Sequence, residues 1–164
     1  CASSGGIAKL PVFRYHIPLW IYSPKHIAPQ RIHRLMAQID IGPTLLGLLG
    51  MDYRSRFYGV DLFQLEPGRE RALIGNYQRL GYLRNDQLIE LAPHRHVGAV
   101  RPEYREDLPQ PEIGLDPTLA REAIGYYQTA SHRFSKGLMV AEPPIARTMG
   151  AATTTPSAAQ EAPP

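Results

Sequence analysis

His16 is the residue of this sequence best placed to do chemistry. It opens an apolar segment, residues 15–24, that has the character of a short buried strand, and α/β folds gather their functional sites at strand ends. A neutral imidazole there could bind a phosphoryl oxygen or pass a proton to a leaving group. The more common situation is a histidine that hydrogen-bonds a neighbouring carbonyl at a strand end. His16 is therefore the substrate-side candidate, with both alternatives open.

Other histidines and acids have simpler explanations. His26 and His33 fall in a polar connector, which predicts exposed surface side chains. Asp40 stands directly before Ile-Gly-Pro-Thr, so helix capping is favoured over metal binding. Asp61 follows Gly59 in an irregular stretch, which favours the capping of a turn over a role in a site.

The remaining candidates make weak sites. His94 and His96 would be two zinc ligands without a third or fourth nearby. Cys1 is the single cysteine, so it supports neither an internal disulfide nor a cysteine zinc site. Ser3 and Ser4 could hydrogen-bond a phosphate. In a segment of small and polar residues, however, serine side chains more often hydrogen-bond the backbone of a turn. No metal ligand is assigned within this chain.

The elements that would position these residues begin with one strand and one helix. Residues 15–24 place β-branched and aromatic residues between two prolines, which predicts a buried strand. A helix is predicted from Asp40 to Gly50, with Pro43 in its first turn. A strand, a connector and a helix in this order indicate an α/β layer. Residues 51–69 carry no long periodicity and are expected to form an ordered loop.

The second half of the chain predicts an antiparallel sheet and a helix. Three apolar segments have the length of strands: residues 71–77, 80–84 and 87–91. Between the last two, Asn85-Asp86 suits a two-residue hairpin turn. A further edge strand could be formed by residues 97–101. Residues 102–115 are rich in proline and acidic residues, which predicts a loop at the surface. An amphipathic helix is predicted from an Asp116 cap to Gly137, with Leu119, Ala123, Tyr126, Tyr127, Ala130 and Phe134 on one face. Residues 1–140 would form one domain, and residues 141–164 a disordered tail rich in Pro, Ala and Thr.

Composition excludes some function classes. The 18 basic residues are scattered among 15 acidic ones, which gives a net charge of +3 and favours a solvated surface over a nucleic-acid site. No apolar run approaches the roughly 20 residues that a membrane span requires. No internal repeat, Gly-rich phosphate loop or G-x-S-x-G motif is present.

Three motifs carry a resemblance to a known family. The text HIPLWIYSP, then QIDIGPTLLGLLG, then FYGVDLF resembles the C-terminal part of a sulfatase-like, alkaline phosphatase superfamily domain, over roughly residues 1–135. These motif sequences are most similar to those of the lipoteichoic acid synthase-like phosphoglycerol transferase branch, as found in Gram-negative envelopes. The resemblance implies an α/β fold: the C-terminal part of an alkaline-phosphatase-like α/β sandwich, with a small antiparallel sheet and a terminal amphipathic helix.

The resemblance also implies an activity for a longer parent protein. Enzymes of this branch carry a phosphoglycerol unit from a phospholipid donor, through a Thr nucleophile, to a glycan or lipid acceptor. They bind a divalent metal (Mn or Zn), and N-terminal helices anchor them in the inner membrane with a periplasmic or extracytoplasmic catalytic domain. An Asp-His metal pair would lie just before Cys1 and the nucleophile further upstream, so this chain alone is expected to be inactive.

Alternatives remain within and outside that branch. A sulfatase or a phosphoethanolamine transferase of the same superfamily would carry the same motifs. A non-catalytic envelope-binding module would explain why no catalytic residue is assigned within this chain. A chain cut from such a domain would also expose apolar surface and a sheet edge. We therefore expect the isolated chain to express poorly or to aggregate.

Overall fold

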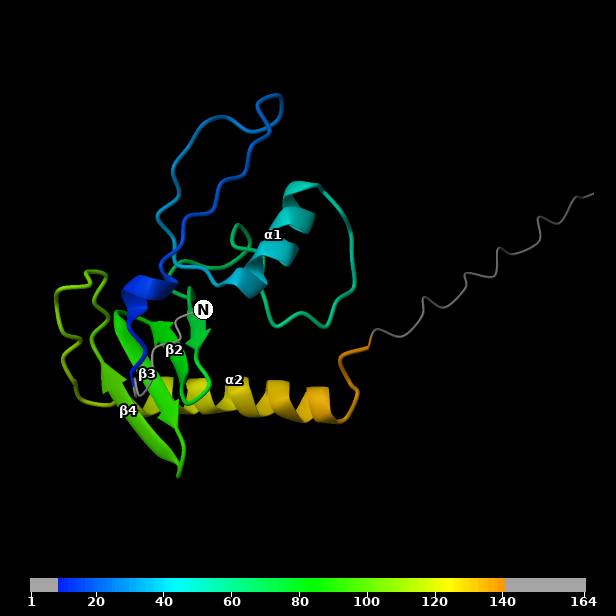
Figure 1. The fold of residues 1–164 in the computed structure, drawn as a ribbon. Coiled ribbons are helices and arrows are strands. Elements are labelled where there is room, and N and C mark those ends of the chain that lie inside the picture. Colours follow the sequence, from blue (N-terminus) through cyan, green and yellow to red (C-terminus); the bar gives the residue numbers. More distant parts are fainter. Residues whose placement is uncertain (1–8, 141–164) are drawn as a thin grey trace, which may run out of the picture.

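The computed structural model describes residues 9–140 of the 164-residue chain. Two short 3-10 helices, two α-helices and four strands are formed by these residues (Figure 1). In chain order they are η1 (Val12–Tyr15), η2 (Gln38–Asp40), α1 (Ile41–Leu48), β1 (Ala72–Gly75), β2 (Leu80–Arg84), β3 (Gln87–Ala92), β4 (His96–Val100) and α2 (Pro117–Ser135).

The four strands form an antiparallel meander in the order β1-β2-β3-β4. Asn85 and Asp86 connect β2 to β3 with φ of 50° and 57°, the left-handed conformation that a two-residue hairpin turn requires and that Asn and Asp tolerate. His94 and Arg95 adopt the same conformation, with φ of 59° and 60°, between β3 and β4. The predicted strands and the Asn85-Asp86 turn are confirmed, as is the mixed α/β class.

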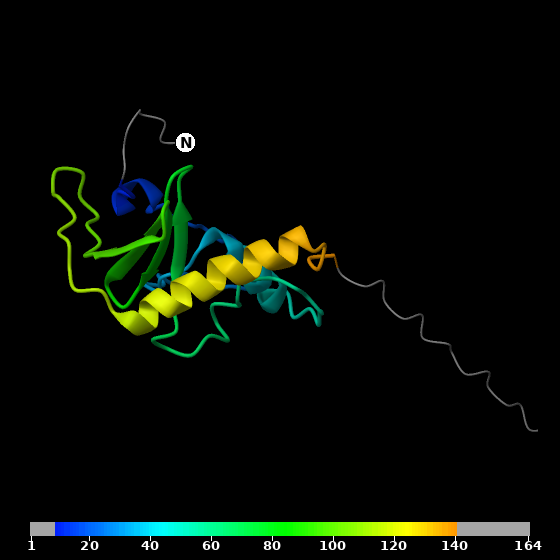
Figure 2. The same cartoon turned by 90° about the horizontal axis from the view of Figure 1, so that it is seen from below.

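Both faces of the sheet are covered. On one face Leu83 and Leu88 pack with Leu10 and Val12 from the N-terminal segment. On the other face Tyr82, Ile89 and Ala99 pack against α2, which runs across the sheet (Figure 2). The core thus has three layers: the N-terminal segment with η1, the sheet, and α2. Each large apolar side chain buried in it contributes about 1.5–3 kcal/mol.

Helix α2 begins and ends at the residues that the sequence predicts. The Asp116 side chain accepts hydrogen bonds from the backbone N–H groups of Thr118 (2.7 Å) and Leu119 (3.3 Å). Past the last turn, Gly137 has φ of +67°, a left-handed conformation that glycine adopts without a Cβ clash. Both ends of the prediction are confirmed.

The predicted apolar face of α2 is only partly buried. Leu119 and Ala123 are 3 % and 0 % exposed, whereas Phe134 is 80 % exposed. The reason is geometric: the C-terminal turns of α2 extend past the sheet (Figure 2), and Phe134 belongs to the last turn of the helix. The prediction of a buried position was wrong for this residue.

The predicted strand of residues 15–24 is absent. Residues 16–23 have no regular secondary structure, apart from the start of a turn near Ser23, and Trp20 and Tyr22 are 86 % and 89 % exposed. This segment is one side of a long loop that rises from the sheet layer beside α1 (Figure 1). A strand needs a neighbour to satisfy its backbone groups, and none of the described residues supplies one.

Helix α1 follows this loop and stops near Gly50, whose φ is +64°, as predicted. Residues 51–69 contain no helix or strand, which confirms the predicted loop. Leu62 anchors that loop in the core at 4 % exposure, whereas Phe57 and Phe63 are 53 % and 44 % exposed. Within residues 9–140, neither α-helix combines the length and the apolar character needed to cross a bilayer. The predicted tail, residues 141–164, lies outside the described residues.

Candidate functional site

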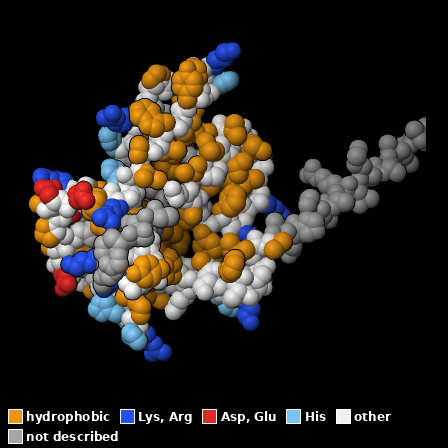
Figure 3. All heavy atoms as spheres, in the orientation of Figure 1, with side chains coloured by type: hydrophobic (Ala, Val, Ile, Leu, Met, Phe, Trp, Pro, Cys, Tyr) orange, Lys and Arg blue, Asp and Glu red, His pale blue; other side chains and the backbone are white. Residues whose placement is uncertain are grey.

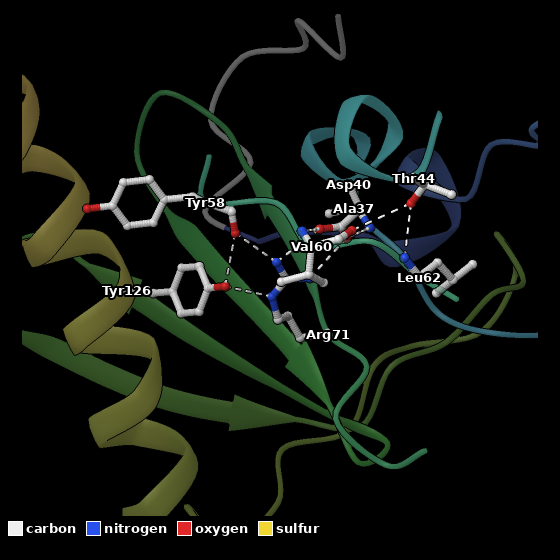
Figure 4. A network of polar contacts seen from close by, with 8 residues as sticks. All are labelled: Ala37, Asp40, Thr44, Tyr58, Val60, Leu62, Arg71 and Tyr126. Atoms are coloured by element: carbon white, nitrogen blue, oxygen red, sulfur yellow. Dashed lines mark hydrogen bonds and ion pairs between the residues drawn. The ribbon is translucent and has the colours of Figure 1, made fainter. Parts of the chain in front are cut away.

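A buried ion pair between Asp40 and Arg71 lies at the centre of the polar contacts of this chain (Figure 4). Arg71 Nη1 lies 2.9 Å from Asp40 Oδ2, and Arg71 Nη2 lies 3.0 Å from Asp40 Oδ1. The two residues are 1 % and 4 % exposed. This fork-to-fork geometry is the strongest arrangement that a guanidinium and a carboxylate form.

Asp40 has two further partners. Its carboxylate accepts hydrogen bonds from the backbone N–H groups of Ala37 (2.8 Å) and Val60 (2.9 Å). It makes no capping hydrogen bond to α1. The prediction that Asp40 caps the helix was therefore wrong, because the carboxylate turns back toward Ala37 and across to Arg71. Its oxygens are occupied by protein donors, which also leaves it unsuited to a metal.

Arg71 connects this carboxylate to α2. Its Nε donates to the Tyr126 hydroxyl (2.8 Å), and its Nη2 also donates to the Tyr58 carbonyl (3.0 Å). Burial lowers the pKa of Arg71, but its hydrogen bonds to Asp40 and Tyr126 outweigh burial and leave the pKa raised. The permanently charged Arg71 thus holds the start of α1, the loop at Tyr58, β1 and α2 together. This is a structural centre.

His16 lies at the surface, directly after η1, and is exposed. Its ring meets the ring of Tyr104 edge-on, with 5.4 Å between the centroids and 69° between the planes. Burial raises the pKa of Tyr104, and the negative charge of Asp86 adds to this shift. His16 therefore presents a solvent-accessible imidazole on an aromatic support, at the edge of the sheet layer.

A shallow pocket of about 380 Å³ adjoins this pair. Tyr104 lines it together with His33, Arg34, Leu35, Glu70, Leu83, Asn85 and Asp86. Arg34 is committed to structure, because it donates to Glu70 (2.7 Å) and to the carbonyls of Leu62 and Leu65. Tyr104 thus contacts the ring of His16 and shares this surface pocket with His33, whereas His16 itself does not line the pocket.

The structure keeps most other candidates apart. His26 and His33 are exposed, as predicted, and His94 and His96 are exposed as well. His26 Nδ1 lies 3.1 Å from Ser23 Oγ in an exposed turn, a local contact between residues three apart. Asp61 accepts from the Phe63 N–H (2.9 Å), which confirms turn capping. Cys1, Ser3 and Ser4 lie outside the described residues.

The residues present do not fit a metal centre. Across residues 9–140, no group of three or more His, Cys, Asp or Glu side chains is placed to hold an ion. Acidic side chains that lie in the core are already paired, as with Glu90, which accepts from the Leu10 N–H (3.1 Å) and Arg79 Nη1 (2.6 Å). We derive no catalytic step through a metal from this part of the chain.

Sequence reasoning missed Arg71 and Glu90. Both lie in apolar segments with the character of strands, RALIG and QLIEL. This apolar context was the available signal. A charged residue within a buried strand must pair with an opposite charge or with hydrogen-bonding groups. The identity of the partner could not be read, because Asp40 and Arg71 are far apart in the chain.

No protein-family profile matches this chain. Among solved structures, it is similar to a protein in the alkaline phosphatase superfamily from Vibrio parahaemolyticus. The TM-score is 0.77 and the identity 29 %, and the match covers 86 % of this chain. The similarity supports the alkaline phosphatase superfamily. It does not select a branch within it.

The match covers 34 % of the Vibrio chain, so the present chain spans about a third of that protein's length. The Vibrio chain therefore continues well beyond the part that is similar to the present chain.

Proposed function

We propose that this chain is the C-terminal part of the catalytic domain of a metal-dependent sulfatase-like transferase. The enzyme would move a phosphoglycerol-type group from a phospholipid to an envelope glycan or lipid, through a Thr nucleophile upstream of Cys1. The observation that carries this proposal is the similarity to an alkaline phosphatase superfamily protein over 86 % of the chain. The branch rests on the HIPLWIYSP and QIDIGPTLLGLLG motifs.

In this proposal the present chain supplies support and one substrate contact. The metal, Mn or Zn, would be bound by residues outside this chain, which is why the 164 residues alone would be inactive. The Asp40–Arg71–Tyr126 contacts would fix the elements on which the site is built. His16, exposed and held edge-on by Tyr104, would donate a hydrogen bond to a phosphoryl oxygen of the substrate.

The surroundings of the enzyme follow from the same proposal. The parent would be anchored by upstream helices in the inner membrane, with its catalytic domain in the periplasm or otherwise outside the cytoplasm. Its partners would be the phospholipid donor and the acceptor, and it would bind no nucleic acid.

The test uses the full-length product of the gene. Incubation with manganese and fluorescent phosphatidylglycerol should release diacylglycerol, and chelation should abolish that release. Turnover of an aryl sulfate instead would indicate a sulfatase, and turnover of phosphatidylethanolamine a phosphoethanolamine transferase. No turnover of any of these esters would favour the non-catalytic binding module.

A pair of histidine variants tests the role of His16. His16→Phe keeps a ring next to Tyr104 but removes the N–H donor, so it should lower kcat/KM by about 10- to 100-fold, the effect of losing a hydrogen bond to a charged oxygen. His33→Phe is the matched control, because His33 is also an exposed histidine and is not proposed to contact the substrate. Equal activity of the two variants would remove His16 from the site.

A further inference from the structure

The loop segment Ile17–Tyr22, which we call the apolar arm, exposes side chains that proteins normally bury. Ile17, Trp20 and Tyr22 are 56 %, 86 % and 89 % exposed. Residues 17–22 include no charged side chain. Within the part of the chain that the structure describes, no backbone hydrogen bond is made by these residues. The arm thus has unpaired backbone groups as well as uncovered apolar surface.

Helix α1 adds a second uncovered surface next to the arm. Its sequence, IGPTLLGL, contains no charged residue, and only Pro43 and Thr44 are buried. Leu45 and Leu48 are 38 % and 40 % exposed, and Leu49, directly after the helix, is 72 % exposed. A helix that is apolar on all sides is typical of the interior of a larger protein.

The arm and α1 present one apolar face. Both project from the same side of the sheet layer in the ribbon view (Figure 1), and hydrophobic side chains gather over this part of the molecule in the space-filling view (Figure 3). An aromatic side chain carries roughly 150–250 Å² of surface, so Trp20 and Tyr22 alone contribute about 300 Å². The largest apolar patch on a typical monomer is about 300–600 Å². The leucines of α1 add to this area, so the face is at least comparable with the largest apolar patch of a typical monomer.

We propose that this face is an interface within one catalytic domain, and that its occupant is the polypeptide preceding this chain in the same enzyme. Residues 17–22 would become a strand of a sheet that this polypeptide supplies, and α1 would pack on that sheet. Three observations argue for this occupant: the strand-like composition of the arm, its unpaired backbone, and a structural neighbour about 2.5 times as long, as the two coverages of 86 % and 34 % require. The inference rests on the proposed function only in taking the occupant to be the rest of that enzyme.

Hydrogen exchange tests the proposed strand. In the 164-residue chain the amides of residues 17–22 should exchange rapidly. In the full-length gene product they should exchange about 100-fold or more slowly, because strand pairing would protect them. The amides of β2 (Leu80–Arg84) are the internal control, since the sheet protects them in both proteins. Equally fast exchange of the arm in both proteins would overturn the proposal.

Aromatic substitutions test the packing separately. Trp20→Ser should lower the Tm of the full-length product and leave the Tm of the 164-residue chain unchanged. Tyr77→Ser is the matched control, because Tyr77 is 76 % exposed in the turn between β1 and β2 and should change neither Tm. An unchanged Tm of full-length Trp20→Ser would count against the interface.

Two other occupants give different results. Trp20 is the only tryptophan of this chain, so acrylamide quenching of its fluorescence reports directly on the arm. Quenching of the 164-residue chain that falls as concentration rises would indicate a second copy and overturn the proposal. Strong protection at all concentrations would indicate coverage by the chain's own ends and would also overturn it. Protection in the full-length product without lipid turnover would uphold the interface while the proposed function failed.

Discussion

Replacing Asp40 with asparagine should be one of the most destabilising single substitutions in this chain. The change keeps the size of the side chain but removes the charge opposite Arg71, which is 4 % exposed and would become an unpaired buried cation. Breaking a buried ion pair in this way costs about 3–5 kcal/mol. Total stabilities of domains are about 5–15 kcal/mol, so the loss would be a large share of the whole.

The measurement is pulse proteolysis of the 164-residue chain across a urea series, at a concentration low enough to limit aggregation. With a slope of about 2 kcal/mol per molar urea, a loss of 3–5 kcal/mol lowers the unfolding midpoint by roughly 2 M. Asp107→Asn is the matched control. Asp107 pairs with Arg105 at 2.7 Å, but their side chains are 65 % and 67 % exposed, so the control should lose less than about 1 kcal/mol.

A double substitution completes the test. Replacing both partners, as in Asp40→Leu with Arg71→Met, removes the unpaired charge that each single change leaves behind. The double variant should therefore lose less stability than the sum of the two single variants. Equal midpoints for Asp40→Asn and Asp107→Asn would refute the reasoning, since they would show that the buried pair contributes no more than an exposed one.

Three further predictions concern the sheet and α2. Burial raises the pKa of Tyr127 to about 12, whereas the tyrosine of the unfolded chain loses its proton near pH 10. The contribution of Tyr127 to the free energy of unfolding should therefore be complete below pH 10 and should be lost between pH 10 and about 12. Unfolding midpoints measured from pH 8 to 12 check this, and Tyr127→Phe should reduce the alkaline loss. Gly81→Ala would place a Cβ 2.8–2.9 Å from three side-chain carbons and should cost about 1–3 kcal/mol, whereas Gly114→Ala, with nothing within 4 Å, should cost less than about 1 kcal/mol in the same urea assay. Asp116→Ala removes the α2 cap and should cost about 0.5–2 kcal/mol, with a matching loss of helical circular dichroism at intermediate urea.

Much of the second half of the fold could be predicted from the sequence because its signals are local. Asn85-Asp86 forces a tight turn between two strands, and that turn sets their register. Asp116 and Gly137 mark the ends of α2 through backbone chemistry at those positions alone. Such features need no knowledge of distant residues.

The errors concern partners that lie far apart or outside the described residues. Asp40 stands at a helix start and resembles a cap, but its carboxylate binds Arg71 and the Val60 N–H, which no local pattern reveals. Residues 15–24 have the composition of a strand, but composition cannot supply the neighbouring strand. His16 stays a prediction, since its ring contact with Tyr104 describes its surroundings without establishing what binds there.

The sequence of the transcript upstream of the codon for Cys1 is the decisive measurement for the proposed enzyme. We expect an open reading frame that encodes an Asp-His pair just before Cys1, a Thr nucleophile further back and membrane-spanning helices before that. A stop codon or an unrelated sequence at that point would contradict this expectation, and this chain would then be a binding module rather than part of an enzyme.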